Sequence, residues 1–188
     1  MINQEFKRGF ILSQLLDLSK LPILLSADGL DIALEIAAKI IELFQTQKKL
    51  FICGIDKFQN IARDLVDDFH SGLLMNRPLL PVELFEPPVN NKSLSSSEWD
   101  KGKEGDGFLI ISGESSKLIE EIIKIAKEKK FYTFVFCGYP PLKTNQPDYL
   151  FYIPLLNRPR LEELFLMLGH VICTLVESTL YSDGNSFC

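Results

Sequence analysis

Residues 105–116 read GDGFLIISGESS, in which four consecutive apolar residues stand between two glycine-containing turns. A short apolar run bounded by glycines is typical of a buried strand, here residues 108–111, and a helix is expected to follow from about 115 to 129. The same alternation recurs along the chain. Further strands are predicted at 50–53, 81–85, 132–137 and 149–153, and further helices at 57–71 and 160–181.

This alternation decides the fold class. Strands that alternate with helices form right-handed βαβ units, which build a sheet with helices on both faces. The chain is therefore predicted to be an α/β protein, a doubly wound three-layer sandwich. Its sheet is expected to be five-stranded, mainly parallel and flavodoxin-like.

Helices are also predicted at both ends of the chain. Two precede the first strand, at 5–18 and from the N-cap candidate Asp28 to about 45. The last helix is apolar around most of its circumference, and a terminal helix on a small domain can bury one side against its own sheet. We therefore expect a homo-oligomer, a dimer or tetramer, with this helix at the interface. The alternative is a helix sandwiched within the monomer.

Composition limits the classes of protein. The 188 residues are enough for a single domain (1–188), and the net charge of −5 argues against a direct nucleic-acid partner. No uninterrupted apolar run is long enough for a membrane span, and the start lacks the pattern of a signal peptide. The four cysteines show no CxxC spacing, which is typical of reduced thiols. We expect a cytoplasmic protein without a membrane partner.

Residues 86–107 interrupt the pattern. This segment is rich in proline, asparagine, serine and glycine, with the lone Trp99 in its middle. Loops of this length are usually functional or disordered. A mobile surface loop is predicted, and an ordered lid is the alternative.

Two turns after predicted strands are candidates for substrate binding, one at Gly54 and Lys57 and the other at residues 112–116. In the second turn Ser112, Gly113, Ser115 and Ser116 precede a helix, whose N-terminus attracts anions. Plain N-capping by Ser115 or Ser116 explains these residues equally well.

Three further side chains are candidates for chemistry. Asp64 and Asp68 stand four residues apart on one face of the predicted helix 57–71, where a carboxylate pair serves as general base or metal ligand, or is only solvated. His170 follows Gly169 in the most apolar helix of the chain. It is either a core or interface residue or a catalytic group.

Taken together, these pieces resemble the sugar isomerase (SIS) domain family, most closely its phosphoheptose isomerase branch. The branch of the DnaA initiator-associating protein is similar to nearly the same degree. The resemblance spans nearly the whole chain. It is carried by residues 49–54, 76–78, 105–112, 148–154 and 160–163.

The resemblance implies a chemistry. The family's isomerases interconvert aldoses and ketoses through a cis-enediol, with a carboxylate base at the position of Asp68 and an acid–base histidine at that of His170. Some members bind zinc at the positions of Asp64, Asp68, Glu162 and His170. Here the acidic residues favour a harder divalent metal than zinc. No cofactor is expected to be required.

The chain also departs from the family pattern. Its turn at 54–58 lacks the family's extra glycines and serine and carries Asp56 and Phe58, and Glu114 replaces a neutral residue in the second turn. A carboxylate about 6 Å from a phosphate costs roughly 2–3 kcal/mol at an effective dielectric of 20.

These departures favour a protein that binds a phosphosugar or sugar nucleotide with degenerate catalytic and phosphate-binding motifs. The alternatives are an active sedoheptulose 7-phosphate isomerase, an isomerase with a less anionic substrate, and a regulator that binds the replication initiator DnaA as its protein partner.

Overall fold

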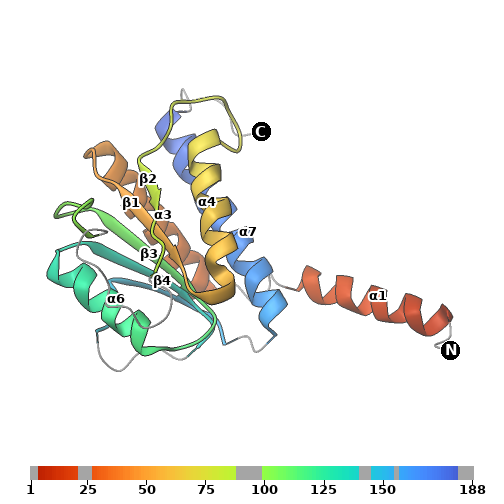
Figure 1. The fold of residues 1–188 in the computed structure, drawn as a ribbon. Coiled ribbons are helices and arrows are strands. Elements are labelled where there is room, and N and C mark those ends of the chain that lie inside the picture. Colours follow the sequence, from red (N-terminus) through yellow and green to blue (C-terminus); the bar gives the residue numbers. More distant parts are fainter. Residues whose placement is uncertain (1–3, 21–26, 88–98, 140–144, 155–156, 182–188) are drawn as a thin grey trace.

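The computed structural model describes residues 4–20, 27–87, 99–139, 145–154 and 157–181 (Figure 1). For Asp28, the predicted N-cap, the backbone is described but the side chain is not. The elements follow the predicted order closely. They are α1 (Gln4–Ser19), α3 (Ala27–Gln45), β1 (Leu50–Gly54), a 3-10 turn (Asp56–Phe58), α4 (Gln59–Ser71), β2 (Val82–Leu84), β3 (Gly107–Ser112), α6 (Lys117–Glu128), β4 (Tyr132–Cys137), β5 (Tyr149–Tyr152) and α7 (Arg158–Tyr181).

The five strands form one sheet in the order β2-β1-β3-β4-β5, and every neighbouring pair is parallel. The predicted fold class is confirmed, with the sheet fully parallel. In this order the chain direction across the sheet reverses between β1 and β3. Ligands of such sheets bind at that switch point, beyond the carboxyl ends of the strands.

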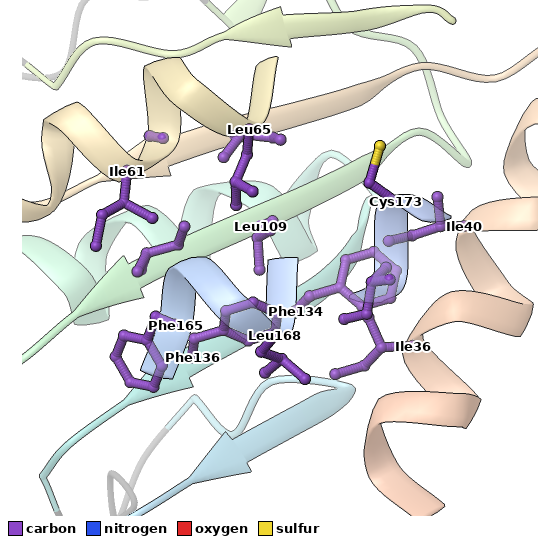
Figure 2. Packing of buried hydrophobic residues seen from close by; sticks show 14 of the residues in the cluster. Ile36, Ile40, Ile61, Leu65, Leu109, Phe134, Phe136, Phe165, Leu168 and Cys173 are labelled. Atoms are coloured by element: carbon purple, nitrogen blue, oxygen red, sulfur yellow. The ribbon is translucent and has the colours of Figure 1, made fainter. Parts of the chain in front are cut away.

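Helices cover both faces of the sheet (Figure 1). Helices α3, α4 and α7 lie on one face and α6 lies on the other. Beneath the first group, side chains from all three helices interlock with those of the central strands (Figure 2). Fully buried members include Ile36, Ile40, Leu65, Phe134 and Phe165.

A second core lies between the sheet and α6, and it includes Trp99. This indole is 3% exposed and stacks on Phe108, with ring centroids 4.9 Å apart. Asp106 is also buried and accepts N–H groups from Lys49 and Lys103. Trp99 and Asp106 are thus packed against the body, whereas Asp100, Lys101, Lys103 and Glu104 are exposed, as expected of a surface loop. The mobility of this segment stays a prediction. Residues 88–98 of the predicted loop lie outside the described residues.

Helix α7 has α4 beside it in Figure 1 and also packs on α3. By length and composition alone α7 is apolar enough to cross a membrane, but half of that window is buried inside the protein, as in a core helix. Helices α3 and α4 therefore cover about half of the apolar circumference of α7, and a partner subunit on the remainder stays a prediction. Val171 remains 56% exposed.

Helix α1 projects from the body (Figure 1). It is tied to α7 by a hydrogen bond from the Arg160 guanidinium to Gln14 Oε1 at 2.9 Å. It leaves a group of large apolar side chains in solvent. Those exposed by 52% to 59% are Phe10, Ile11, Leu12, Leu15 and Leu16.

Three of the four cysteines, Cys53, Cys137 and Cys173, are described, and all three are free and buried. This agrees with the prediction of reduced thiols. Cys188 lies outside the described residues.

Gly54 ends β1 where the chain folds back closely on itself. A Cβ at this position would lie 2.1 Å from the carbonyl oxygen of Phe58, which is backbone and unable to move aside. We expect Gly54→Ala to lower the free energy of unfolding by about 1–3 kcal/mol or more in urea denaturation. Gly9→Ala is the control, because nothing lies within 4 Å of its Cβ in α1. An unchanged midpoint for Gly54→Ala would contradict this packing.

Candidate functional site

The switch point between β1 and β3 is covered by Phe58. Its ring is 2% exposed and packs on Phe165, with centroids 5.8 Å apart, while Arg158 Cζ lies 5.9 Å from its centroid. A Cβ on Gly113 would come within 2.7 Å of the Phe58 ring. A phenyl ring therefore packs directly over the glycine that was predicted to contact a substrate.

The hydroxyls of the second turn are largely engaged within the protein. Ser112 is buried, and its Oγ donates to the Glu114 carbonyl at 2.8 Å. Ser116 is the N-cap of α6, and its Oγ accepts the Ile119 N–H at 3.4 Å. The N-capping alternative is thus confirmed for Ser116. Ser115 is exposed.

The charged residues of the two turns point outward. Asp56, Lys57 and Glu114 are all exposed, and Asp56 adopts a left-handed backbone with φ of 55°. An aspartate tolerates this conformation better than most residues. These side chains form the rim of the switch point and leave its interior to Phe58.

The structure brings together two of the predicted catalytic residues. His170 Nε2 on α7 lies 3.2 Å from Asp68 Oδ2 on α4, with the side chains 45% and 20% exposed. The approach lacks the alignment of a hydrogen bond. Asp68 Oδ2 is consequently a buried oxygen without a hydrogen-bond partner among the described residues. A buried acceptor without a partner needs an explanation, and a catalytic role is one of them.

Burial raises the pKa of the Asp68 carboxyl above its usual range. The nearby His170 opposes this shift, and the carboxylates of Asp64 and Asp67 add to it. Desolvation disfavours the charged form of the carboxyl, so Asp68 takes up a proton more readily than an exposed aspartate. A carboxyl of this kind beside an imidazole is suited to proton transfer.

Gly169 allows the two helices to approach at this point. A Cβ there would lie 2.3 Å from Leu65 Cδ2, one turn before Asp68 on α4. A side chain at this position would require Leu65 or α7 to shift, and a shift of α7 would carry His170 with it. The signal in the sequence was a glycine inside a helix, which usually has a packing reason.

The four predicted metal ligands are not gathered into one cluster. Asp64 is exposed, and Glu162 Oε1 lies 3.3 Å from Arg158 Nε. Glu162 and His170 are separated by about 12 Å along α7, at 1.5 Å per residue. Over the described ranges, no three His, Cys, Asp or Glu side chains lie close enough to hold a metal ion.

The predicted turns and the Asp68–His170 pair are also separate. Asp68 lies about 14 Å along α4 from the first residue of that helix, at 1.5 Å per residue. The candidate residues therefore form two groups, the switch point at one end of α4 and the Asp68–His170 pair further along it.

Sequence reasoning missed the buried ion pair of Arg77 and Glu177. Its Nε and Oε1 atoms lie 3.3 Å apart, and the side chains are 1% and 0% exposed. The contact is an ion pair without hydrogen-bond alignment at Nε. The sequence does carry a signal for this pair. Glu177 stands among apolar residues of the last helix, and a buried glutamate must find partners.

Comparison with known proteins adds to this geometry. No protein-family model matches the chain. The phosphoheptose isomerase of Synechocystis sp. (strain ATCC 27184 / PCC 6803 / Kazusa) is 30% identical over 160 residues, which cover 77% of this chain and 81% of that protein.

Two solved structures share the fold. The phosphoheptose isomerase from Francisella tularensis superposes with a TM-score of 0.73 at 18% identity, over 92% of this chain and 98% of that one. A HobA–DnaA (domain I-II) complex from Helicobacter pylori gives 0.69 at 16%, over 99% and 100%. At such identities the likeness is one of fold.

The switch-point sheet and its helices define an α/β domain of the SIS class. Within that class, the chain belongs to the phosphoheptose isomerase-like branch of the SIS-domain family.

Proposed function

We propose that this protein binds a sugar derivative between α4 and α7, in contact with Asp68 and His170. The observation that carries the proposal is the 3.2 Å approach of Asp68 Oδ2 to His170 Nε2. Both side chains are reachable from solvent, and the carboxylate oxygen lacks a hydrogen-bond donor among the described residues. A sugar hydroxyl would supply such a donor if the His170 ring moved aside, because this oxygen is buried beneath it.

The phosphate-binding motif is degenerate in this proposal. Phe58 packs over Gly113, and the hydroxyls of Ser112 and Ser116 are engaged within the protein. Lys57 and Ser115 are the exposed groups left to meet a phosphate. A phosphosugar would therefore gain less from its phosphate here than at a glycine-rich turn with free donors.

A second candidate function is aldose–ketose isomerisation at the same pair. Proton transfer requires the acid and base within hydrogen-bond reach of the reacting atoms, and the Asp68–His170 approach supports it. Asp68 would move the proton between adjacent substrate carbons. His170 would move protons to and from the oxygen atoms bonded to those two carbons.

One set of variants tests both functions. We expect sedoheptulose 7-phosphate to raise the melting temperature of the wild type, and Asp68→Asn and His170→Gln to remove most of that rise. Ligand at 100 times its Kd stabilises by about 2.7 kcal/mol, equal to several degrees for a chain of this size. Aldose product formation by the same samples decides between binding and isomerisation.

Glu121→Gln is the control, because Glu121 is exposed on α6, across the sheet from Asp68 and His170. It should respond to ligand as the wild type does. If Asp68→Asn and His170→Gln respond equally well, the pair is not the binding site. If neither the phosphosugar nor the unphosphorylated sugar stabilises the wild type, sugar binding is wrong.

Assembly and metal binding belong to the same proposal. The exposed apolar residues of α1, together with Leu30, Leu34 and Val171, support a cytoplasmic homo-oligomer in which a second copy covers them. A divalent ion held by Asp68 and His170 would take further ligands from the sugar or from that second copy. DnaA binding stays a prediction from the resemblance alone.

A further inference from the structure

The buried ion pair of Arg77 and Glu177 joins the two helices that carry the catalytic candidates. The Arg77 guanidinium donates to the carbonyl oxygens of Phe69 at 2.8 Å and Asp68 at 3.4 Å, in the last turn of α4. It also donates to the carbonyl of Pro78 at 3.1 Å. Arg77 thus holds the backbone of Asp68 itself.

The other half of the pair is on α7. Glu177 stands seven positions after His170, which is two helical turns and therefore the same face of α7. Its carboxylate accepts the backbone N–H groups of Leu73, Leu74 and Met75 at 3.0 to 3.1 Å. Those residues form the segment that leaves α4. The segment between α4 and β2 is therefore bound to Glu177 of α7 twice, through the N–H groups of residues 73–75 and through Arg77.

We propose that Arg77 and Glu177 are positioning residues that hold Asp68 against His170. This inference rests on the proposed function of that pair. The route is short and buried: from the Asp68 carbonyl to Arg77, from Arg77 to Glu177, and from Glu177 along two turns of α7 to His170. Neither member of the ion pair touches the exposed face between Asp68 and His170, and each acts through the backbone.

The chemistry of the pair suits positioning better than stability alone. Replacing a buried ion pair by apolar residues of similar volume is often neutral or stabilising, so stability is a weak reason to keep one. A planar guanidinium reaches several carbonyl oxygens and a carboxylate at fixed angles, which lysine is unable to reproduce. A misplacement of about 1 Å at a reacting pair costs on the order of 100-fold in rate.

Arg77→Lys tests the proposal, because lysine keeps the positive charge but lacks the planar group with several fixed N–H donors. We expect kcat for sedoheptulose 7-phosphate to fall about 100-fold while KM changes less than 3-fold. The chain has two histidines, so the His170 ring signals are readily assigned by NMR with His70→Gln. In Arg77→Lys these ring signals should move toward their positions in Asp68→Asn.

Ile123→Ala is the stability control. Ile123 is fully buried on α6, across the sheet from α4 and α7. It should lower the melting temperature while leaving the His170 signals and kcat as in the wild type. Unmoved His170 signals in Arg77→Lys would overturn the proposal. If the wild type shows no turnover, isomerisation fails, and the ring signals still decide whether the ion pair positions His170.

Discussion

Glu177→Ala lowers the free energy of unfolding by about 3–5 kcal/mol, the expected loss when one partner of a buried ion pair is removed. The side chain of Glu177 has 0% exposure, so nothing from solvent replaces its carboxylate. Removal leaves the Arg77 guanidinium buried without its anion. It also deprives the N–H groups of residues 73–75 of their acceptor.

Urea denaturation followed by circular dichroism measures this loss. Glu121→Ala is the control, because Glu121 is exposed on α6 and such surface changes stay within about 0.5 kcal/mol. Should Glu177→Ala fail to fold, Glu177→Gln keeps the volume and one acceptor oxygen and is expected to fall between wild type and alanine. A loss below about 1 kcal/mol for Glu177→Ala would show that the carboxylate is not buried in solution.

Leu12→Asp combined with Leu16→Asp is expected to convert a homo-oligomer to the 21.4 kDa monomer. Both leucines are more than half exposed on α1, a helix that leaves the body of its own chain (Figure 1). Covering each would contribute on the order of 1 kcal/mol, about half of the value for full burial of leucine. A charge in a covered interface removes that gain and adds a desolvation cost.

Light scattering after size exclusion gives the particle mass. Leu79→Asp is the control, since Leu79 is 72% exposed but lies in the connection between α4 and β2, away from α1. It should leave the mass unchanged. A wild type that is already monomeric at micromolar concentration would refute the proposed assembly.

The elements of this fold were accessible from the sequence because their signals are local. The runs at residues 50–53 and 132–137 are each followed by a glycine, and the structure places strands there within one residue. Helix α4 shows one apolar stripe, and the residues of this stripe are buried: Ile61, Ala62, Leu65, Val66 and Phe69. Local periodicity determines which side of each element is buried.

Predictions that depended on distant residues fared differently. The polar segment around Trp99 predicted a surface loop, and its charged residues 100–104 are exposed, but the indole itself is buried on Phe108 and Phe85. The apolar circumference of α7 predicted a partner subunit; α3 and α4 of the same chain cover about half of it, and a partner on the remainder stays a prediction. In both cases the covering residues belong to other parts of the fold, which the local pattern does not identify.

For the candidate site, too, the sequence identified the residues but not the contact between them. Asp68 and His170 were named from their positions in the family pattern, but a separation of a hundred residues carries no distance between their side chains. That distance follows from the close approach at Leu65 and Gly169 and from the ion pair of Arg77 and Glu177.

The sequence by itself determined the order of strands and helices, the parallel α/β class and the identity of the acid–base candidates, because these depend on periodicity and motif. Tertiary structure alone decided that Phe58 fills the switch point, that Trp99 is a core residue, and that His170 meets an unsatisfied carboxylate oxygen. Those outcomes depend on the close packing of side chains from separate helices and strands, which no local sequence pattern specifies.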